Sequence, residues 1–326
     1  MPTIDLHRHL EGSIRPSTAL ALARKHQHWL AADSRPLHRL VAPVRTAGLL
    51  DYLERIDVAC STARAVEDWS LIAQQAVQDC FDEGLDYAEI RFSPWFIHTQ
   101  TGLDPAEVID AITDAARDAS ALLNLPVAFI GIIVRDLGPD TAMRQMNTIL
   151  SRSGRFCGVD LAGDEAGYPP ALFTPAFARA HDAGLRVTAH AGEAAGPDSV
   201  RAALQALRPD RIGHGVRAAE DPRLMEQLAD AGITLEVALT SNVQTRAAAS
   251  LREHPIKRLL QAGVPVSLNT DNPTPSATGV AAEFRRAATE VGLSEAQLQL
   301  IVRDSAAAAF TEAGRQLART RSAADN

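Results

Sequence analysis

Two histidines close the first apolar segment of this 326-residue chain in an H-x-H pattern, His7 and His9. Alternate residues of a strand face the same side, so the two imidazoles are expected to point together. Three later apolar segments also end in residues that bind metals or move protons: His190 with Glu193, His214, and Asp271. Neutral imidazoles with one carboxylate suit a borderline divalent ion such as zinc. A further glutamate and histidine beside that ion are what hydrolytic chemistry needs.

The elements that would position these residues are eight short runs rich in valine, isoleucine and leucine, which predict buried strands. The runs cover residues 3–7, 85–92, 127–134, 158–162, 186–191, 211–214, 234–239 and 265–270. Amphipathic helical patterns separate most of them, and glycine or asparagine often closes the helix before the next strand. This alternation predicts an α/β fold of the (β/α)8 TIM-barrel type. An open doubly wound sheet is the alternative, but no G-x-G-x-x-G follows the first strand.

Active sites of such barrels lie at the C-terminal ends of the strands. His190, His214 and Asp271 end the predicted strands five, six and eight, so all would meet the H-x-H pair at one mouth. Each residue alone also has an ordinary structural explanation. The H-x-H pair could be satisfied surface or core histidines, and His214 could be a structural histidine between two glycines. Glu193 could complement a helix dipole, and Asp271 could cap a turn. Convergence on one mouth favours a metal-dependent hydrolytic site.

The chain is expected to form one barrel domain over residues 1–326. A barrel needs about 250 residues, and the surplus falls mainly in a helical insertion at roughly 16–84. Within it we expect helices at 17–26, 49–63 and 66–81 and an irregular loop or cap at 30–44. A last long helix is expected at 294–319, followed by a polar tail at 320–326 that frays.

Composition narrows the possible partners. The formal net charge of -8 argues against nucleic acid, which usually meets a basic face. Three cysteines with no C-x-x-C spacing fit free thiols in a reducing compartment. No secretory signal and no apolar run of membrane length is visible, so we expect a cytoplasmic protein without a membrane partner. The oligomeric state stays open.

Several residues near the predicted strand ends could have either a functional or a structural role. Arg91 and Ser93 could line a pocket or serve structure, as could residues 240–242 and the aromatic pair at 95–96. Asp164 and Glu165 are interpreted as acids at a helix start, without a catalytic role. Gly163 would let a flat ligand approach backbone amides.

Taken together, the motifs resemble the adenosine deaminase family of metal-dependent amidohydrolases, and especially its bacterial members. The resemblance covers nearly the whole chain and rests on D-L-H-R-H-L-E-G-S at 5–13, E-I-R-F-S-P at 89–94, D-L-A-G-D-E at 160–165, H-A-G-E at 190–193, R-I-G-H-G at 211–215, L-T-S-N at 239–242 and L-N-T-D at 268–271. The cytidine-type deaminases, with H-x-E and P-C-x-x-C, are not matched.

The resemblance implies one zinc ion per chain, held by four residues: His7, His9, His190 and Asp271. It implies a hydrolase that acts on a cyclic amidine C–N bond, and converts adenosine or 2′-deoxyadenosine to the inosine product and ammonia in purine salvage. Water would add to C6 of the purine while Glu193 protonates N1. His214 would orient that water and stabilise the developing charge, and Asp271 would accept a hydrogen bond from it.

Substrate contacts implied by the resemblance fall on four residues: His9, Glu11, Gly163 and Asn272. Two of them depart from the commonest pattern of the family. Many members carry aspartate at the position of Glu11, where it meets the ribose 5′-hydroxyl, and glutamate there is similar to adenine deaminases. Many also carry aspartate at the position of Asn272, which meets purine N7; the asparagine amide can donate to an unprotonated N7. An adenine deaminase, or a deaminase of another modified adenosine, is therefore the alternative.

Overall fold

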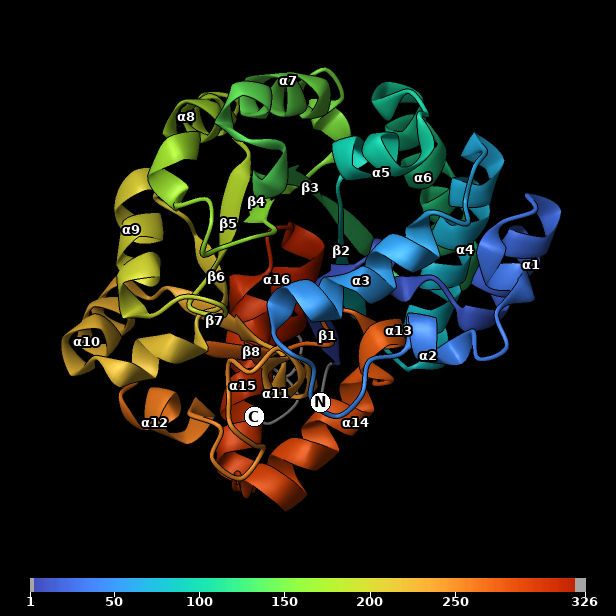
Figure 1. The fold of residues 1–326 in the computed structure, drawn as a ribbon. Helices are drawn as coiled ribbons and strands as arrows, with labels where there is room; N and C mark the ends of the chain where they lie inside the picture. Colours follow the sequence, from blue (N-terminus) through green and yellow to red (C-terminus); the bar gives the residue numbers. More distant parts are fainter. Residues whose placement is uncertain (1–2, 320–326) are drawn as a thin grey trace.

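Eight parallel strands form a barrel in the computed structural model of the chain, which describes residues 3–319 (Figure 1). The strands are β1 (Ile4–His9), β2 (Tyr87–Phe92), β3 (Val127–Val134), β4 (Gly158–Ala162), β5 (Arg186–Ala191), β6 (Arg211–His214), β7 (Thr234–Val237) and β8 (Val266–Leu268). They pair in sequence order, from β1 to β8. The predicted (β/α)8 TIM barrel is confirmed, and all eight strands fall where the apolar runs place them. The single-domain organisation stays a prediction.

Helices surround the barrel. They are α1 (Pro16–Lys25), α2 (Leu37–Leu40), α3 (Leu49–Cys60), α4 (Val66–Asp82), α5 (Pro94–Thr101), α6 (Pro105–Leu123), α7 (Pro139–Leu150), α8 (Thr174–Asp182), α9 (Pro197–Leu207), α10 (Pro222–Ala231), α11 (Leu239–Gln244), α12 (Ile256–Gln261), α13 (Pro273–Ser276), α14 (Val280–Arg286), α15 (Glu295–Ala308) and α16 (Glu312–Arg319). Within residues 3–319, no helix combines the length and apolar character needed to cross a bilayer.

The insertion between β1 and β2 contains α1, α3 and α4, close to the bounds expected for its three helices. The segment expected to be irregular also contains two short helical turns, η2 (Trp29–Ala32) and α2. In Figure 1, α3 crosses in front of the barrel. Its residues line the same cavity as residues at the strand ends, so α3 covers the mouth of the barrel on its C-terminal side.

The closing seam of the barrel lies between β1 and β8. It has one isolated parallel bridge, between Arg8 and Asp271. The side chain of Asn269 reinforces it, because Oδ1 accepts from the Leu6 N–H at 2.9 Å and Nδ2 donates to the Val237 carbonyl at 3.3 Å. All of these groups are buried. One asparagine therefore connects three neighbouring strands where regular pairing is short.

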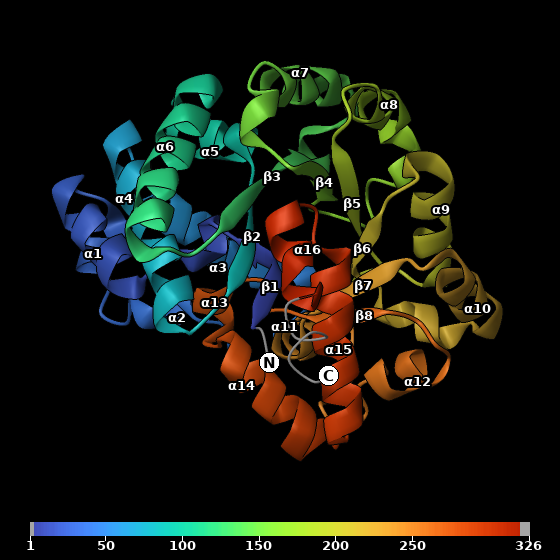
Figure 2. The same ribbon diagram turned by 180° about the vertical axis from the view of Figure 1, so that it is seen from behind.

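The opposite end of the barrel is covered by α15 and α16, which lie in front of the strands in Figure 2. The expectation of one long helix at 294–319 is wrong, because the chain is extended at Ala309 between the two helices. The break has a polar cause inside the barrel. The Phe310 N–H donates to buried Glu89 at 2.6 Å, and the Ala308 carbonyl accepts from buried Arg211 at 2.9 Å. The expected fraying tail at 320–326 lies outside the described residues.

Replacing Asn269 tests the seam. Asn269→Ala leaves the Leu6 N–H without an acceptor inside the barrel, and an unsatisfied buried donor costs about 1–3 kcal/mol. We expect the free energy of unfolding, measured by urea titration, to fall by about that amount. Ser267→Ala is the matched control, because it removes only the hydroxyl that accepts from Asn269 at 2.9 Å. Equal losses for the two variants would contradict a special role of Asn269 in closing the barrel.

Candidate active site

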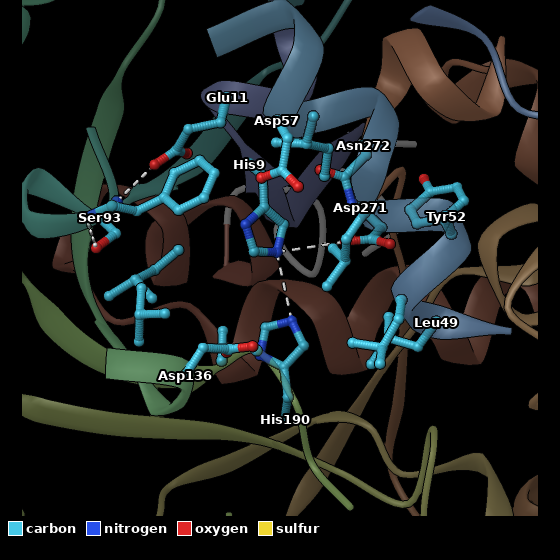
Figure 3. A pocket seen from close by; sticks show the side chains of 18 of the residues that line it. His9, Glu11, Leu49, Tyr52, Asp57, Ser93, Asp136, His190, Asp271 and Asn272 are labelled. Atoms are coloured by element: carbon cyan, nitrogen blue, oxygen red, sulfur yellow. Dashed lines mark hydrogen bonds and ion pairs between the residues drawn. The ribbon is translucent and has the colours of Figure 1, made fainter. Parts of the chain in front are cut away.

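Four ligand-type side chains meet at the mouth of the barrel, from β1, β5 and the segment after β8. One donor atom from each of His7, His9, His190 and Asp271 lies within 4.8 Å of every other. His9 Nε2 lies 3.3 Å from both His190 Nε2 and Asp271 Oδ1, as Figure 3 shows by dashed lines. His7 Nε2 lies 3.4 Å from the same carboxylate oxygen. The structure thus brings together all four residues that the sequence predicts as metal ligands.

The barrel seam fixes three of these residues through their backbone. The His9 N–H donates to the Asp271 carbonyl at 2.8 Å, and the Asp271 N–H donates to the His7 carbonyl at 2.8 Å. Asp271 adopts a φ of 62° and His214 a φ of 58°. Left-handed backbone is costly for residues other than glycine, and such strain concentrates at functional sites.

Two carboxylates inside the barrel orient the histidines. His7 Nδ1 lies 2.7 Å from Glu236 Oε2, and His190 Nδ1 lies 3.1 Å from Asp160 Oδ2. Each carboxylate contacts Nδ1 of its histidine, so that Nε2 of the same ring faces the other ligand-type side chains. A carboxylate behind a ligating histidine is the usual arrangement in metal sites, because it fixes both the ring and its tautomer.

Buried arginines keep those carboxylates charged. Arg91 bridges them, with Nη1 2.9 Å from Asp160 and Nη2 2.8 Å from Glu236. Arg211 Nε lies 2.6 Å from Glu236 on the other side. Burial alone would raise the pKa of Glu236, but the two guanidinium groups and His7 hold it well below its usual value. This settles the open reading of Arg91: it does not line the cavity but supports the residues that do.

Glu193 and His214 stand beside the cluster, with Glu193 Oε2 3.5 Å from His214 Nε2. Burial raises the pKa of Glu193 well above its usual value, and the nearby Asp271 carboxylate adds to the rise. Burial therefore favours the protonated, neutral form of the Glu193 side chain. Its Oε1 atom is buried and has no hydrogen-bond partner among residues 3–319. A proton source is thus available at the mouth of the barrel.

A cavity of about 440 Å³ opens above the cluster. Its walls come from the strand ends and from α3 and α5, and include four residues predicted as substrate contacts: His9, Glu11, Gly163 and Asn272. In the described part of the chain, Glu11 Oε2 and Asn272 Oδ1 are buried without a partner, as is Glu193 Oε1. Buried polar atoms normally find partners, so three such oxygens around one cavity suit a polar ligand. Figure 3 shows Glu11 directed toward Ser93, whose N–H donates to it at 2.7 Å.

Comparison with known proteins agrees with this geometry. The family model described as adenosine deaminase matches residues 2–322. An adenosine deaminase from Serratia proteamaculans is 40% identical over 301 residues, which is 92% of this chain and 91% of the relative. The chain belongs to the adenosine deaminase family. The predicted class of enzyme, a hydrolytic deaminase, is thereby confirmed.

The solved structures that resemble this chain include deaminases named for different substrates. An adenine deaminase from Arthrobacter aurescens superposes with a TM-score of 0.90 at 25% identity and covers 99% of this chain and 98% of its own. An N6-methyl-AMP deaminase from Arabidopsis thaliana has a TM-score of 0.83 at 27% identity, covering 99% and 97%. The barrel is common to them, so the choice of substrate depends on residues of the cavity.

Sequence reasoning missed several residues of this site. Glu236 and Arg211 had a visible signal, because each is a charged residue inside an apolar strand. Asp57 and Asp136 line the cavity from the helical insertion and from the end of β3, and no motif marks them. Phe96 also lines the cavity, whereas its neighbour Trp95 donates from Nε1 to Thr148 at 3.0 Å instead.

Glu165 corrects a further interpretation, since no helix begins beside it. Its buried carboxylate accepts the N–H groups of all four residues from 192 to 195, at 2.5–3.1 Å. Those residues form the loop that carries Glu193. Glu165 therefore shapes the position of the acid without touching the cavity.

Glu165→Gln should loosen this loop, because one amide nitrogen would face N–H groups that need acceptors. We expect amide hydrogen exchange at residues 192–195 to accelerate at least tenfold, with a loss of about 1–3 kcal/mol in the free energy of unfolding. Asp164→Asn is the control, since the Asp164 carboxylate accepts from the Gly167 N–H at 3.0 Å and does not contact the loop that carries Glu193. Unchanged exchange in Glu165→Gln would contradict this role.

Proposed function

We propose that this chain catalyses the zinc-dependent hydrolytic deamination of adenosine and 2′-deoxyadenosine, releasing ammonia and the inosine product in purine salvage. One observation carries the proposal. A cluster of three histidines and one aspartate lies at the base of a cavity, beside the buried Glu193, whose pKa burial raises well above its usual value. The chain around it is 40% identical to an adenosine deaminase over 92% of its length. We further propose that the enzyme is cytoplasmic.

The donor set fits one zinc ion. Three imidazole nitrogens and one carboxylate oxygen are ligands that zinc prefers, and they come from His7, His9, His190 and Asp271. The Nδ1 atoms of His7 and His190 already meet carboxylates, so Nε2 is the atom left for the ion. When bound, zinc supplies Lewis-acid activation of the attacking water.

The proton goes to the purine from Glu193. Burial raises its pKa well above the usual value and so favours the protonated form, which a general acid requires. Protonation at N1 makes C6 electrophilic as water adds there. His214 orients that water, and Asp271 accepts a hydrogen bond from it. The amino group takes up the proton that the attacking water releases and leaves as ammonia. The C6 hydroxyl returns a proton to Glu193 as the carbonyl forms, so water and adenosine balance inosine and ammonia. Ser241 donates to Asp271 Oδ2 at 2.6 Å and holds the carboxylate in place.

The cavity favours a nucleoside over a free base. The Ser93 N–H holds Glu11 against the end of β2, and we expect the cavity of about 440 Å³ to leave room for a ribose beside it. Burial raises its pKa to about 7, and its free Oε2 can pair with a sugar hydroxyl. Asn272, Gly163 and His9 line the cavity. We expect Asn272 and Gly163 to meet the purine and His9 to contact the substrate beside the metal ligands.

Adenine deamination is the second candidate. It is favoured by the glutamate at position 11 and by the structural similarity to an adenine deaminase at 25% identity. A deaminase of another modified adenosine is a variant of the same alternative. The higher identity to adenosine deaminases and the position of Glu11 weigh against both.

Turnover of adenosine and adenine by the zinc-loaded protein decides between these candidates. We expect kcat/KM for ammonia release to favour adenosine by at least a hundredfold, because a buried polar group left unpaired penalises the smaller substrate. 2′-Deoxyadenosine should give a kcat/KM similar to that of adenosine. N6-methyladenosine is included in the same panel to test for a deaminase of a modified adenosine. A preference for adenine would overturn the proposal and establish the second candidate.

Glu193→Gln tests the proton donor. The amide keeps the shape of the side chain but cannot supply the proton, so kcat on adenosine should fall about a hundred- to ten-thousandfold. Zinc content and the thermal midpoint should stay near those of the parent. Glu220→Gln is the control, because Glu220 forms an exposed ion pair with Arg217. Turnover within threefold of the parent would remove Glu193 from the mechanism.

Glu236→Gln tests the support of the ion. The variant weakens the contact behind His7 and removes the carboxylate that Arg91 and Arg211 share, so zinc affinity should fall about 10–100-fold. Arg91 keeps its ion pair with Asp160, and Arg211 keeps its ion pair with Glu89. Competition with a chelator measures that affinity, and the parent should hold one zinc per chain. Thr188→Val is the control, because it removes only a 3.2 Å contact to the same carboxylate. Equal zinc affinity in the parent, Glu236→Gln and Thr188→Val would contradict the role of Glu236 in supporting the zinc ligand His7.

A further inference from the structure

A chain of three buried side chains runs away from the cavity behind His214. Asn242 Nδ2 lies 2.9 Å from His214 Nδ1, and Asn242 Oδ1 lies 3.2 Å from His254 Nε2. His254 Nδ1 in turn lies 3.2 Å from the backbone nitrogen of Ile256. The segment from 239 to 256 thus places a second histidine in line with the first, outside the set of residues that touch substrate.

The direction of these hydrogen bonds is fixed at the far end. Ile256 is the first residue of α12, and an N–H in the first turn of a helix has no acceptor within the helix. A backbone N–H can only donate, so Nδ1 of His254 is the acceptor and carries no proton. Burial lowers the pKa of His254 to about 3, so the ring is neutral. Its single proton therefore lies on Nε2.

The proton on His254 also fixes the orientation of the Asn242 amide. Because His254 Nε2 donates, it must face the amide oxygen, and the amide NH₂ must then face His214. The NH₂ group donates to His214 Nδ1, which is therefore an acceptor. An imidazolium would present a second donor to the amide NH₂, so this contact disfavours the charged ring. Neutral His214 with its proton on Nε2 is the state that satisfies every member of the chain.

We propose that Asn242 and His254 are positioning residues that keep His214 in the Nε2-protonated tautomer, and that His214 consequently acts as a hydrogen-bond donor rather than as a general base. The proposal rests on the deaminase function proposed above. It gives His214 a defined task, because a donor at Nε2 can orient a water and stabilise negative charge on it. Nε2 is the atom that faces Glu193 Oε2 at 3.5 Å, on the cavity side.

The tautomer can be observed directly. Zinc-loaded protein labelled with ¹⁵N-histidine gives long-range ¹H–¹⁵N spectra in which protonated and unprotonated ring nitrogens are distinct. The His214 and His254 signals are assigned by their loss in His214→Gln and His254→Gln. We expect both rings to be neutral, with protonated Nε2 and unprotonated Nδ1. A protonated Nδ1 on His214, or averaging between the two tautomers, would overturn the proposal.

Variants of the chain supply the second test. Asn242→Asp offers only acceptors to His214, so its Nδ1 should become protonated and kcat should fall about a hundredfold. KM should change by less than about threefold, since the substrate contacts stay in place. His254→Ala should let the amide of Asn242 turn and produce a mixture of His214 tautomers. If Asn242→Asp does not fold, the parent spectrum and His254→Ala still decide the question.

His181→Asn is the control, because His181 binds the Leu207 carbonyl at 2.8 Å on the outer helices and should leave the His214 signals unchanged. An Asn242→Asp protein with the parent tautomer and the parent kcat would contradict the proposal. The spectra do not depend on turnover. A protein that shows the expected His214 tautomer but releases no ammonia from adenosine would support the positioning role of Asn242 and His254. The same result would contradict the proposed function.

Discussion

The contact between Glu236 and its two arginines is the interaction on which the site depends. A carboxylate buried in a barrel is costly unless opposite charges and hydrogen bonds compensate it. Arg91 and Arg211 provide that compensation at 2.8 and 2.6 Å, and His7 takes the remaining side. The charge that orients the proposed zinc ligand is thus held by the interior of the fold rather than by the loops around the mouth.

This network continues to the other end of the barrel. Arg211 Nη2 lies 2.6 Å from Glu89, which accepts the Phe310 N–H from the turn between α15 and α16. The guanidinium carbon of Arg211 also lies 3.5 Å from the centre of the Phe310 ring. The turn between the C-terminal helices therefore forms hydrogen bonds with the buried ion pairs that begin behind His7. These contacts explain why the last helical pattern is interrupted, which the sequence pattern alone does not indicate.

The fold and the cluster were accessible from sequence because both follow local rules. Apolar runs that alternate with helical patterns predict the strands, and the rule that active sites lie at strand ends places His190, His214 and Asp271 at one mouth. The supporting residues were harder to predict, because their roles depend on distant pairings. Glu165 accepts from a loop 27 or more residues further along the chain, and Glu236 meets His7 across 229 residues. His254 resembles an ordinary core histidine until the position of Asn242 is known.

The most direct test of this account is anomalous diffraction at the zinc edge from crystals of the zinc-loaded protein. We expect a single ion at the base of the cavity, with about 2.0–2.1 Å to Nε2 of His7, His9 and His190 and about 2.0–2.2 Å to the carboxylate of Asp271. An ion bound through Nδ1, a second bridged ion, or a peak away from these four residues would contradict it.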